Sequence, residues 1–227
     1  GTIYTAAEQI EAAGGRALPL VVDIRDDVRL QEAAAEAAHH FGGIDILINN
    51  ASAIYLAGTL QTPMKRFDLM MQVNVRGTFA ASQAVLPYLQ KSANPHILTL
   101  SPPLSLSPHW FRNHTAYTIS KYGMSMTVLG MAEEFKDQGI AVNALWPKTV
   151  IQTDALAMLG GLVAPKNCRK PEIVADASCE IIKRDSESCS GNFFIDEDVL
   201  REAGVNDFSA YAVEEGQPLL PDLFLDS

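Results

Sequence analysis

Short runs of apolar residues alternate along the chain with longer segments in which apolar residues recur every three or four positions. We expect each of the five apolar runs to form a strand: residues 17–23, 44–50, 96–101, 140–147 and 192–196. Runs that are apolar almost throughout are typical of parallel strands covered by helices on both faces. We expect the five periodic segments to form helices: residues 2–13, 28–41, 64–90, 117–136 and 171–183.

The alternation of strands and helices predicts the fold class. An α/β chain of this kind forms a doubly wound parallel sheet of the Rossmann type, with right-handed crossovers. We interpret residues 1–227 as a single domain and residues 197–227 as its C-terminal extension. Residues 197–203 favour a short helix. The acidic, proline-containing end that follows is a packed extension, a subunit contact or a disordered end.

A glycine-rich phosphate-binding turn after a first strand is absent from the pattern. The first expected element is a helix that leads into the strand at residues 17–23, and the pair Gly160-Gly161 follows no strand. Without a preceding strand, the backbone groups of residues 17–23 would lack partners on one side. We therefore expect that an N-terminal β-α-β segment of roughly 40–50 residues is missing from this sequence, which makes the domain incomplete at its N-terminus.

Composition and charge narrow the class of protein. A net charge of −10 argues against a nucleic-acid partner, because phosphate neutralisation requires clustered Lys and Arg. No apolar run approaches the roughly 20 residues of a membrane span, and the N-terminal residues do not resemble a secretory signal. The three cysteines are spaced neither for zinc nor for a disulfide framework, and the five histidines form no ligand pattern. We expect a cytoplasmic protein with reduced thiols and no catalytic metal.

Tyr117 and Lys121 are the strongest candidates for chemistry. They are four residues apart at the start of an expected helix, so both side chains lie on one face and reach a common point. A nearby ammonium favours the phenolate and lowers the tyrosine pKa, which makes proton transfer to or from a substrate oxygen feasible. A YxxxK pair alone also arises by chance, so its weight depends on the residues around it.

Four further motifs occur in a fixed order around this pair. They are Asn49-Asn50-Ala51-Ser52 after the second expected strand, Asn74 in the long helix, Asn143 to Pro147 in the fourth strand, and Asp23 at the end of the first. Together with Tyr117 and Lys121, they resemble the short-chain dehydrogenase/reductase family across essentially the whole chain. The segments HILTLSPPLSL, AVNALWPKT and GNFFIDEDVL narrow the resemblance to the hydroxysteroid dehydrogenase-like protein 2 group, without its sterol-carrier domain.

The resemblance implies a role for each matched residue. Tyr117 is then the general acid/base, Lys121 its tuner and a ribose contact, and Asn74 the residue that positions a water and the lysine. Asp23 is implied to contact the adenine ring. The remaining cofactor contacts that it implies are Asn50, Ala51, Pro147 and either Thr149 or Thr153.

For several of these residues, a purely structural role stays open beside the functional one. Asp23 either contacts adenine or only caps a strand end, and Asn50 either contacts the cofactor or only holds a turn. Asn74 within a helix favours a polar role over packing. Trp110 and Phe111 line a substrate pocket or pack in the core. For His114, three residues before Tyr117, an exposed loop histidine is the default reading, against one that faces substrate.

Two positions depart from the family pattern. Pro102 stands where the family has its catalytic serine, which leaves Ser101, Ser105 and Ser107 in the same loop as candidates, and Ser101 is our first choice. Lys148 replaces the glycine that usually follows the strand proline. It pairs with a cofactor phosphate, pairs with an acidic substrate or points to solvent.

The resemblance implies an NAD(P)-dependent oxidoreductase that interconverts a carbonyl and an alcohol on a lipophilic small-molecule substrate. NADP is slightly favoured over NAD. The alternative is a weakly active or inactive cofactor-binding or scaffold protein on the same fold. A nucleotide-sugar epimerase would need a larger C-terminal domain.

A homo-dimer or homo-tetramer is expected, formed through residues 64–90 and 117–136. Five apolar residues of the second segment serve the core, the partner subunit or both: Met124, Met126, Val128, Leu129 and Met131.

Overall fold

A four-stranded parallel sheet forms the centre of the molecule. The computed structural model describes residues 1–157 and 163–225 of the chain. Within them, the strands lie in the order β1, β2, β3 and β4. Their bounds are Ile46–Asn49, His96–Thr99, Ala141–Trp146 and Phe193–Ile195. All three pairs are parallel, as the almost continuous apolar runs predict.

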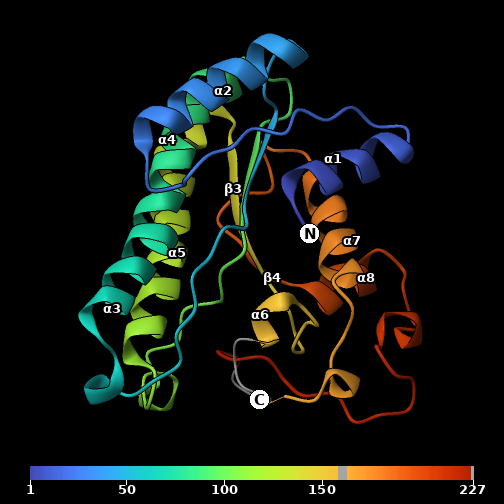
Figure 1. Ribbon diagram of the computed structural model, residues 1–227. Helices are drawn as coiled ribbons and strands as arrows, with labels where there is room; N and C mark the ends of the chain where they lie inside the picture. The colour runs from blue at the N-terminus through green and yellow to red at the C-terminus, as the bar shows by residue number, and fades with distance from the viewer. Residues whose placement is uncertain (158–162, 226–227) are drawn as a thin grey trace.

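Helices cover both faces of this sheet (Figure 1). On one side lie α2, α4 and α5, with bounds Asp27–Phe41, Gly77–Leu89 and Thr115–Glu134. On the other lie α1, α7 and α8, with bounds Ile3–Ala12, Glu172–Ile182 and Asp196–Glu202. Two shorter helices are α3 (Met64–Met70) and α6 (Asp154–Ala157). The doubly wound α/β architecture is confirmed.

The short connecting turns complete the secondary structure. Five of them are single 3-10 turns, at Thr59–Gln61, Pro108–Trp110, Lys136–Gln138, Pro165–Asn167 and Ser209–Tyr211. No helix within residues 1–157 and 163–225 is both long enough and apolar enough to cross a membrane.

The strand expected at residues 17–23 is not formed. This segment is extended but belongs to no strand, and it leads from α1 on one side of the sheet to α2 on the other (Figure 1). A strand exists only where a neighbour satisfies its backbone groups, and apolar composition does not supply one. Val21 is accordingly 68% exposed, and in the described part of the chain β1 pairs with β2 alone.

The helix expected at residues 64–90 is interrupted in the middle. Between α3 and α4 the chain makes a π-helical turn, Met71–Arg76, which contains the fully buried Asn74. A π turn inserts one extra residue into a helix, and such turns are frequent at functional sites. The interruption changes the direction in which Asn74 points, and the hydrogen bonds described below depend on that direction.

Alternating residues of the sheet enter separate apolar clusters on its two faces. In β2, Ile97 packs with Leu89 and Val128 beneath α4 and α5, whereas Leu98 packs with Ile173 and Ile181 beneath α7. This alternation is the period of two that a strand imposes on its side chains. The two faces hold the strands, and therefore their carboxyl ends, in fixed positions.

The apolar residues of α5 divide between the core and the surface. Met124, Val128 and Met131 are buried. Met126 is 57% exposed and Leu129 is 46% exposed. Of the five apolar residues expected to serve the core or a partner, only Met126 and Leu129 can therefore contribute to a surface that contacts a partner.

Candidate active site

Tyr117 and Lys121 lie on the first two turns of α5, at the carboxyl edge of the sheet. Both line a cavity of about 590 Å³, which also includes Asn50 after β1 and Pro147 after β3. Ligands of open α/β sheets bind at this edge, and volumes of roughly 300–1,000 Å³ are usual for small-molecule sites. The cavity lining is mostly apolar, with a few polar groups among it.

Lys121 is held by contacts on three sides. Its Nζ donates to the carbonyl oxygen of Leu100 at 2.7 Å and lies 3.6 Å from the sulfur of Met124. The same nitrogen sits 5.0 Å from the centroid of the Trp146 ring. The side chain is only 3% exposed. These contacts fix the ammonium beside Tyr117, because a chain of four methylenes has little freedom once its end is bound.

The expected lowering of the Tyr117 pKa by Lys121 is wrong for this structure. Burial raises the pKa of Tyr117 well above its ordinary value, and the charge on Asp222 adds to the shift. Burial also lowers the pKa of Lys121 to about 7, against an opposing effect of Asp222. Desolvation disfavours the charged form of each group, and it is the largest cause of both shifts. Tyr117 is therefore a neutral phenol, which is the form that donates a proton.

Asn74 connects the loop after β1 to the helix that carries Tyr117. Its Oδ1 accepts from the backbone N–H of Ala53 at 2.7 Å, and its Nδ2 donates to the Ala53 carbonyl at 2.9 Å. The same Nδ2 donates to Ser120 Oγ at 2.9 Å, and that hydroxyl donates to the Tyr117 carbonyl at 2.8 Å. Asn74 thereby positions the backbone of both the cavity wall and the tyrosine.

The three candidate serines differ in what their hydroxyls bind. Ser105 Oγ accepts from the N–H of Ser107, and Ser107 Oγ lies 2.6 Å from His109 Nδ1, so both serve the loop itself. Ser101 follows Leu100, the residue that Lys121 binds. Its hydroxyl is fully buried and makes no hydrogen bond with any residue that the structure describes. A buried hydroxyl without a partner costs about 1–3 kcal/mol, so Ser101 stays the candidate among the three, although it does not line the cavity.

Lys148 forms an ion pair within the protein. Its Nζ lies 3.1 Å from Glu197 Oε2, and Arg169 binds the other oxygen of the same carboxylate at 2.5 Å. Its backbone N–H donates to Asp196 Oδ1 at 2.9 Å. None of the three roles considered from the sequence describes this arrangement. In place of the family's glycine, the lysine ties the end of β3 to the start of α8.

Asp196 gives a prediction for the pH dependence of stability. This carboxylate is fully buried, and burial raises its pKa to about 6 despite the N–H donors of Lys148 and Glu197. The folded state therefore holds the proton more tightly than the unfolded state, so the free energy of unfolding decreases as pH rises from about 4 to 6. We expect the free energy of unfolding of Asp196→Asn to exceed that of the wild type by about 1–2 kcal/mol at pH 8, and by little or nothing at pH 4.

Urea denaturation of the full-length protein at both pH values checks this expectation. Asp198→Asn is the matched control, because Asp198 is exposed on the same helix. A loss of stability at pH 8 in Asp196→Asn would show that the hydrogen bonds of the carboxylate outweigh the cost of burying its charge.

The other residues implied by the resemblance are divided between the cavity and its surroundings. Asn50, Pro147 and Thr153 line the cavity. Ala51 is exposed beside Asn50. Thr149 is buried, and its hydroxyl has no hydrogen-bond partner among the described residues. Asp23 lies outside the lining. It binds the guanidinium of Arg25 through both oxygens, which lowers its pKa to about 2.

The aromatic residues before Tyr117 belong to one packed cluster. Trp110 and Phe111 pack against buried neighbours that include Tyr117, Tyr122 and Trp146. His114 is half-buried, with its Nδ1 2.9 Å from Thr118 Oγ1, so the reading as an exposed loop histidine is wrong. Burial lowers the pKa of His114. The loop at residues 108–114 therefore packs against the cluster around Tyr117, and none of its residues lines the cavity.

Sequence reasoning missed the contribution of the C-terminal end. Phe224 is 1% exposed and lies in the aromatic cluster around Tyr117, and Asp222 influences the pKa of both Tyr117 and Lys121. Only the apolar residues near the end of an otherwise polar segment gave any signal. Because their partners are about a hundred residues away, periodicity could not reveal this contact.

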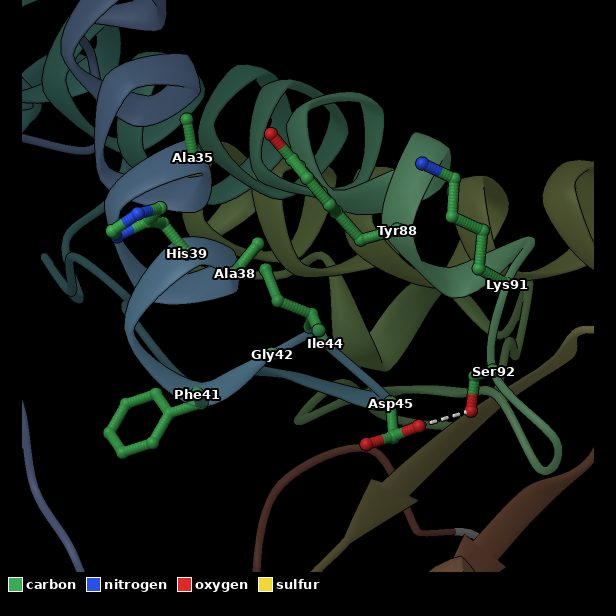
Figure 2. Close-up of a pocket in the computed structure, with 11 residues that line it drawn as sticks. Ala35, Ala38, His39, Phe41, Gly42, Ile44, Asp45, Tyr88, Lys91 and Ser92 are labelled. Carbon is green, nitrogen blue, oxygen red and sulfur yellow. Dashed lines mark hydrogen bonds between the residues drawn. The ribbon is translucent and has the colours of Figure 1, made fainter.

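A second cavity, of about 570 Å³, is less suited to this chemistry (Figure 2). It lies between α2 and α4 at the amino end of β1, and Figure 2 shows Asp45 bonded to Ser92 at its rim. Its lining contains neither Tyr117 nor Lys121. Since ligands of doubly wound sheets bind at the carboxyl ends of the strands, the first cavity is the candidate site.

The fold and the site together define a class of protein. A doubly wound parallel sheet, with a tyrosine and a lysine one helical turn apart at its carboxyl edge, is the arrangement of dinucleotide-dependent dehydrogenases of the short-chain type. The family model described as short chain dehydrogenase matches residues 2–160. The chain belongs to this family.

Similar proteins narrow the group further. The chain is 64% identical over 226 residues to hydroxysteroid dehydrogenase-like protein 2 of Danio rerio, covering 100% of this chain and 54% of that protein. It thus spans about half the length of the curated relatives it matches. A solved structure from Xanthomonas campestris is 56% identical, with a TM-score of 0.97 over 100% of this chain and 83% of that one.

A more distant solved structure contains ligands. It is a 7α-hydroxysteroid dehydrogenase complexed with NADH and 7-oxo glycochenodeoxycholic acid. Its sequence is 26% identical to this chain, with a TM-score of 0.72 over 85% of this chain and 78% of that one. The narrower group expected from the sequence is confirmed by the first of these relatives.

Proposed function

We propose that the chain catalyses reversible hydride transfer between NAD(P)(H) and a carbonyl or alcohol compound. The observation that carries this proposal is the pairing of Tyr117 and Lys121, both buried, at the wall of a cavity on the carboxyl edge of the sheet. Membership of the short-chain dehydrogenase family supports it, because the match covers both residues and the sequence motif resembles the family's catalytic pair.

The cavity fits the nicotinamide end of such a cofactor. Lys121 offers donors for ribose hydroxyls, and Asn50, Pro147 and Thr153 border the same space. The unpartnered hydroxyl of Thr149 is available beside it for the carboxamide. Asp23 is the proposed contact of the adenine ring. Ala51, next to Asn50, is a further proposed contact of the cofactor. The cofactor supplies the hydride, and the resemblance slightly favours NADP(H) over NAD(H).

The residues of the chain supply proton transfer and orientation. Tyr117 donates its proton to the carbonyl oxygen during reduction as a neutral phenol, and its phenolate takes the proton from the hydroxyl during oxidation. Lys121 stabilises the phenolate that remains. Ser101 donates a hydrogen bond to the same oxygen. Asn74 does not touch the substrate, and it holds the cavity wall and Tyr117 in register.

The lining indicates a lipophilic substrate. Its apolar members come from both sides of the cavity and include Ile54, Leu100, Ile151, Val174 and Ile182. Burial of such surface on an apolar compound contributes roughly 25 cal/mol per Å². The 7-oxo bile acid in the more distant dehydrogenase is a carbonyl compound of this kind.

One observation favours the second candidate, a weakly active or inactive cofactor-binding protein. Pro102 occupies the position of the family's serine, and Ser101 is not in the cavity lining. A missing oxyanion donor typically lowers kcat by about 10²- to 10³-fold. Turnover therefore separates the two candidates.

The deciding experiment measures cofactor binding and turnover by the full-length protein. NADPH and NADH are titrated by fluorescence, and both are then assayed with a panel of aldehydes, methyl ketones and steroid ketones and with the matching alcohols. The proposal requires binding and turnover of at least one lipophilic pair. Binding without any turnover would overturn it in favour of the second candidate.

Asp222 gives a prediction for the pH profile of the reaction. Its negative charge raises the pKa of Tyr117, while burial raises its own pKa to about 6. Removing the charge makes the phenol easier to ionise. We expect Asp222→Asn to move the rising limb of kcat/KM for alcohol oxidation to lower pH by about half a unit to one unit.

The measurement is a profile of kcat/KM between pH 6 and 10, with a saturating cofactor. Asp207→Asn serves as the control, because Asp207 accepts a hydrogen bond from the nearby N–H of Ser209 at the surface. An unchanged or upward-shifted limb in Asp222→Asn would contradict the electrostatic role of the carboxylate.

A homo-dimer or homo-tetramer is part of the proposal. The supporting observation is the exposed apolar surface of α4 and α5, which includes Phe79, Ile119, Met126 and Leu129. Exposed patches of this kind mark contacts between proteins.

A cytoplasmic location is consistent with the three cysteines, none of which forms a disulfide in the described part of the chain.

A further inference from the structure

The C-terminal segment reaches the edge of the sheet at which the candidate active site lies. The N–H of Val150 donates to the Leu220 carbonyl at 3.0 Å, and the N–H of Asp222 donates to the Lys148 carbonyl at 3.1 Å. Between them, Thr149 and Pro221 pair as an antiparallel bridge. The segment is therefore bonded through its backbone to the residues that follow β3.

Phe224 is the residue that this path delivers to the site. Its ring is 1% exposed. It contacts five aromatic rings from the loop before α5, from α5 and from β3. The ring centroids lie 5.8 Å away for Trp110, 6.2 Å for His114, 6.1 Å for Tyr117, 5.3 Å for Tyr122 and 5.9 Å for Trp146.

The backbone at Phe224 adopts a conformation that is unfavourable for this residue type. Its φ angle is +72°, in the left-handed region that glycine prefers. The preceding carbonyl, of Leu223, accepts from Trp146 Nε1 at 2.8 Å and holds the turn. Such conformations persist only where the surroundings impose them, and they cluster at functional sites. Here the turn directs an aromatic ring into the cluster beside Tyr117.

Tyr117 and Trp146 lie between Phe224 and the cavity. Both line the cavity, and both contact the Phe224 ring. Phe224 is not itself in the cavity lining, so it packs behind the wall that Tyr117 and Trp146 form. A carbonyl carbon carries two substituents. If one lies along the main cavity, the other is directed toward this aromatic wall.

We propose, on the premise of the hydride-transfer function above, that Phe224 is a specificity-determining residue that limits the size of the second substituent on the reacting carbon. The preferred substrates are aldehydes and methyl ketones with one long apolar arm. A ketone with two bulky substituents is excluded, because the Phe224 ring packs behind Tyr117 and Trp146 and keeps this wall from yielding to the second substituent.

The activity test compares two ketones on the full-length protein. Octan-2-one has one small substituent, and hexanophenone has two large ones. In Phe224→Ala, the ratio of kcat/KM for hexanophenone to that for octan-2-one should rise about tenfold or more, the scale of discrimination by a few methylenes in an apolar pocket. Phe208→Ala is the matched control: Phe208 is buried in the separate cluster beneath α7 and α8, so its loss should leave the ratio unchanged.

A binding test does not depend on turnover. Trp110 and Trp146 are the only tryptophans in the sequence, and both contact Phe224, so tryptophan emission reports on this cluster. Cyclohexanol is a suitable probe because it does not absorb at the excitation wavelength. Its dissociation constant for Phe224→Ala should be about tenfold lower than for the wild type, because the apolar cavity left by a phenyl ring accepts a ring of that size. Phe208→Ala should bind as the wild type does.

The outcomes are separable. An unchanged ketone ratio together with unchanged cyclohexanol affinity in Phe224→Ala would overturn the proposal. If no ketone is turned over even by the wild type, the hydride-transfer function fails, and the cyclohexanol titration alone decides whether Phe224 closes the pocket. If Phe224→Ala does not fold, Phe224→Leu takes its place, with a smaller rise of the ratio expected and no rise overturning the proposal.

Discussion

Tyr117→Phe is expected to lower kcat/KM by about 10³-fold while leaving cofactor affinity and the melting temperature almost unchanged. The substitution removes one oxygen and keeps the ring that packs against Phe224 and the neighbouring aromatic residues. Only the proton donor is lost.

Steady-state assays, NADPH titration and thermal unfolding of the full-length protein measure the three quantities. Tyr122→Phe is a close control, because Tyr122 is a buried tyrosine of the same helix that also contacts Phe224. Its kcat/KM should change by less than about threefold, since its hydroxyl has no part in the proposed reaction. Full activity in Tyr117→Phe would refute the mechanism.

Much of the framework could be predicted from the sequence. Parallel strands buried on both faces are apolar almost throughout, so 44–50, 96–101, 140–147 and 192–196 could be recognised as strands. The segment 17–23 has the same composition but forms no strand. The difference lies in hydrogen-bonding partners outside the segment, which its own residues do not encode.

The candidate site was only partly predictable, for a related reason. A spacing of four on a helix is local information, and it brought Tyr117 and Lys121 together. Burial is not local. It reverses the expected shift of the Tyr117 pKa, and it depends on Trp146 and on Phe224, which lies about a hundred residues further along the chain.

Lys148 illustrates the same limit. Its position in the motif suggested a partner in the cofactor or the substrate, whereas Glu197 binds it. Glu197 begins a helix whose approach to the end of β3 is a property of the tertiary structure. A motif therefore identifies a position more securely than it identifies a side chain's partner.

Asn74 is expected to produce the largest loss of stability among the polar residues of the site. Its side chain is fully buried and satisfies the N–H and the carbonyl of Ala53 as well as the hydroxyl of Ser120. Asn74→Ala leaves all three groups without that partner. Unsatisfied buried groups cost about 1–3 kcal/mol each before relaxation, so a total loss of about 3–4 kcal/mol is expected.

The same substitution should also lower activity, because Asn74 joins the cavity wall to the turn of α5 that carries Tyr117. At a temperature where Asn74→Ala remains folded, we expect kcat to fall about 10²-fold with a smaller change in KM, as for a misplaced catalytic group. Ser120→Ala is the companion variant. It breaks the link to the Tyr117 carbonyl but keeps both bonds of Asn74 to Ala53, so it should lower kcat as well, at a stability cost of only about 1 kcal/mol.

Urea denaturation and steady-state kinetics on the two variants separate positioning from packing. If Asn74 served only to fill the π turn, stability would fall in Asn74→Ala while kcat of the folded fraction stayed at the wild-type value. If it positions Tyr117, kcat of the folded fraction falls and the pH at which activity rises also moves, because the surroundings of the Tyr117 hydroxyl change. The second result is the one that the hydrogen bonds from Asn74 through Ser120 to the Tyr117 backbone require.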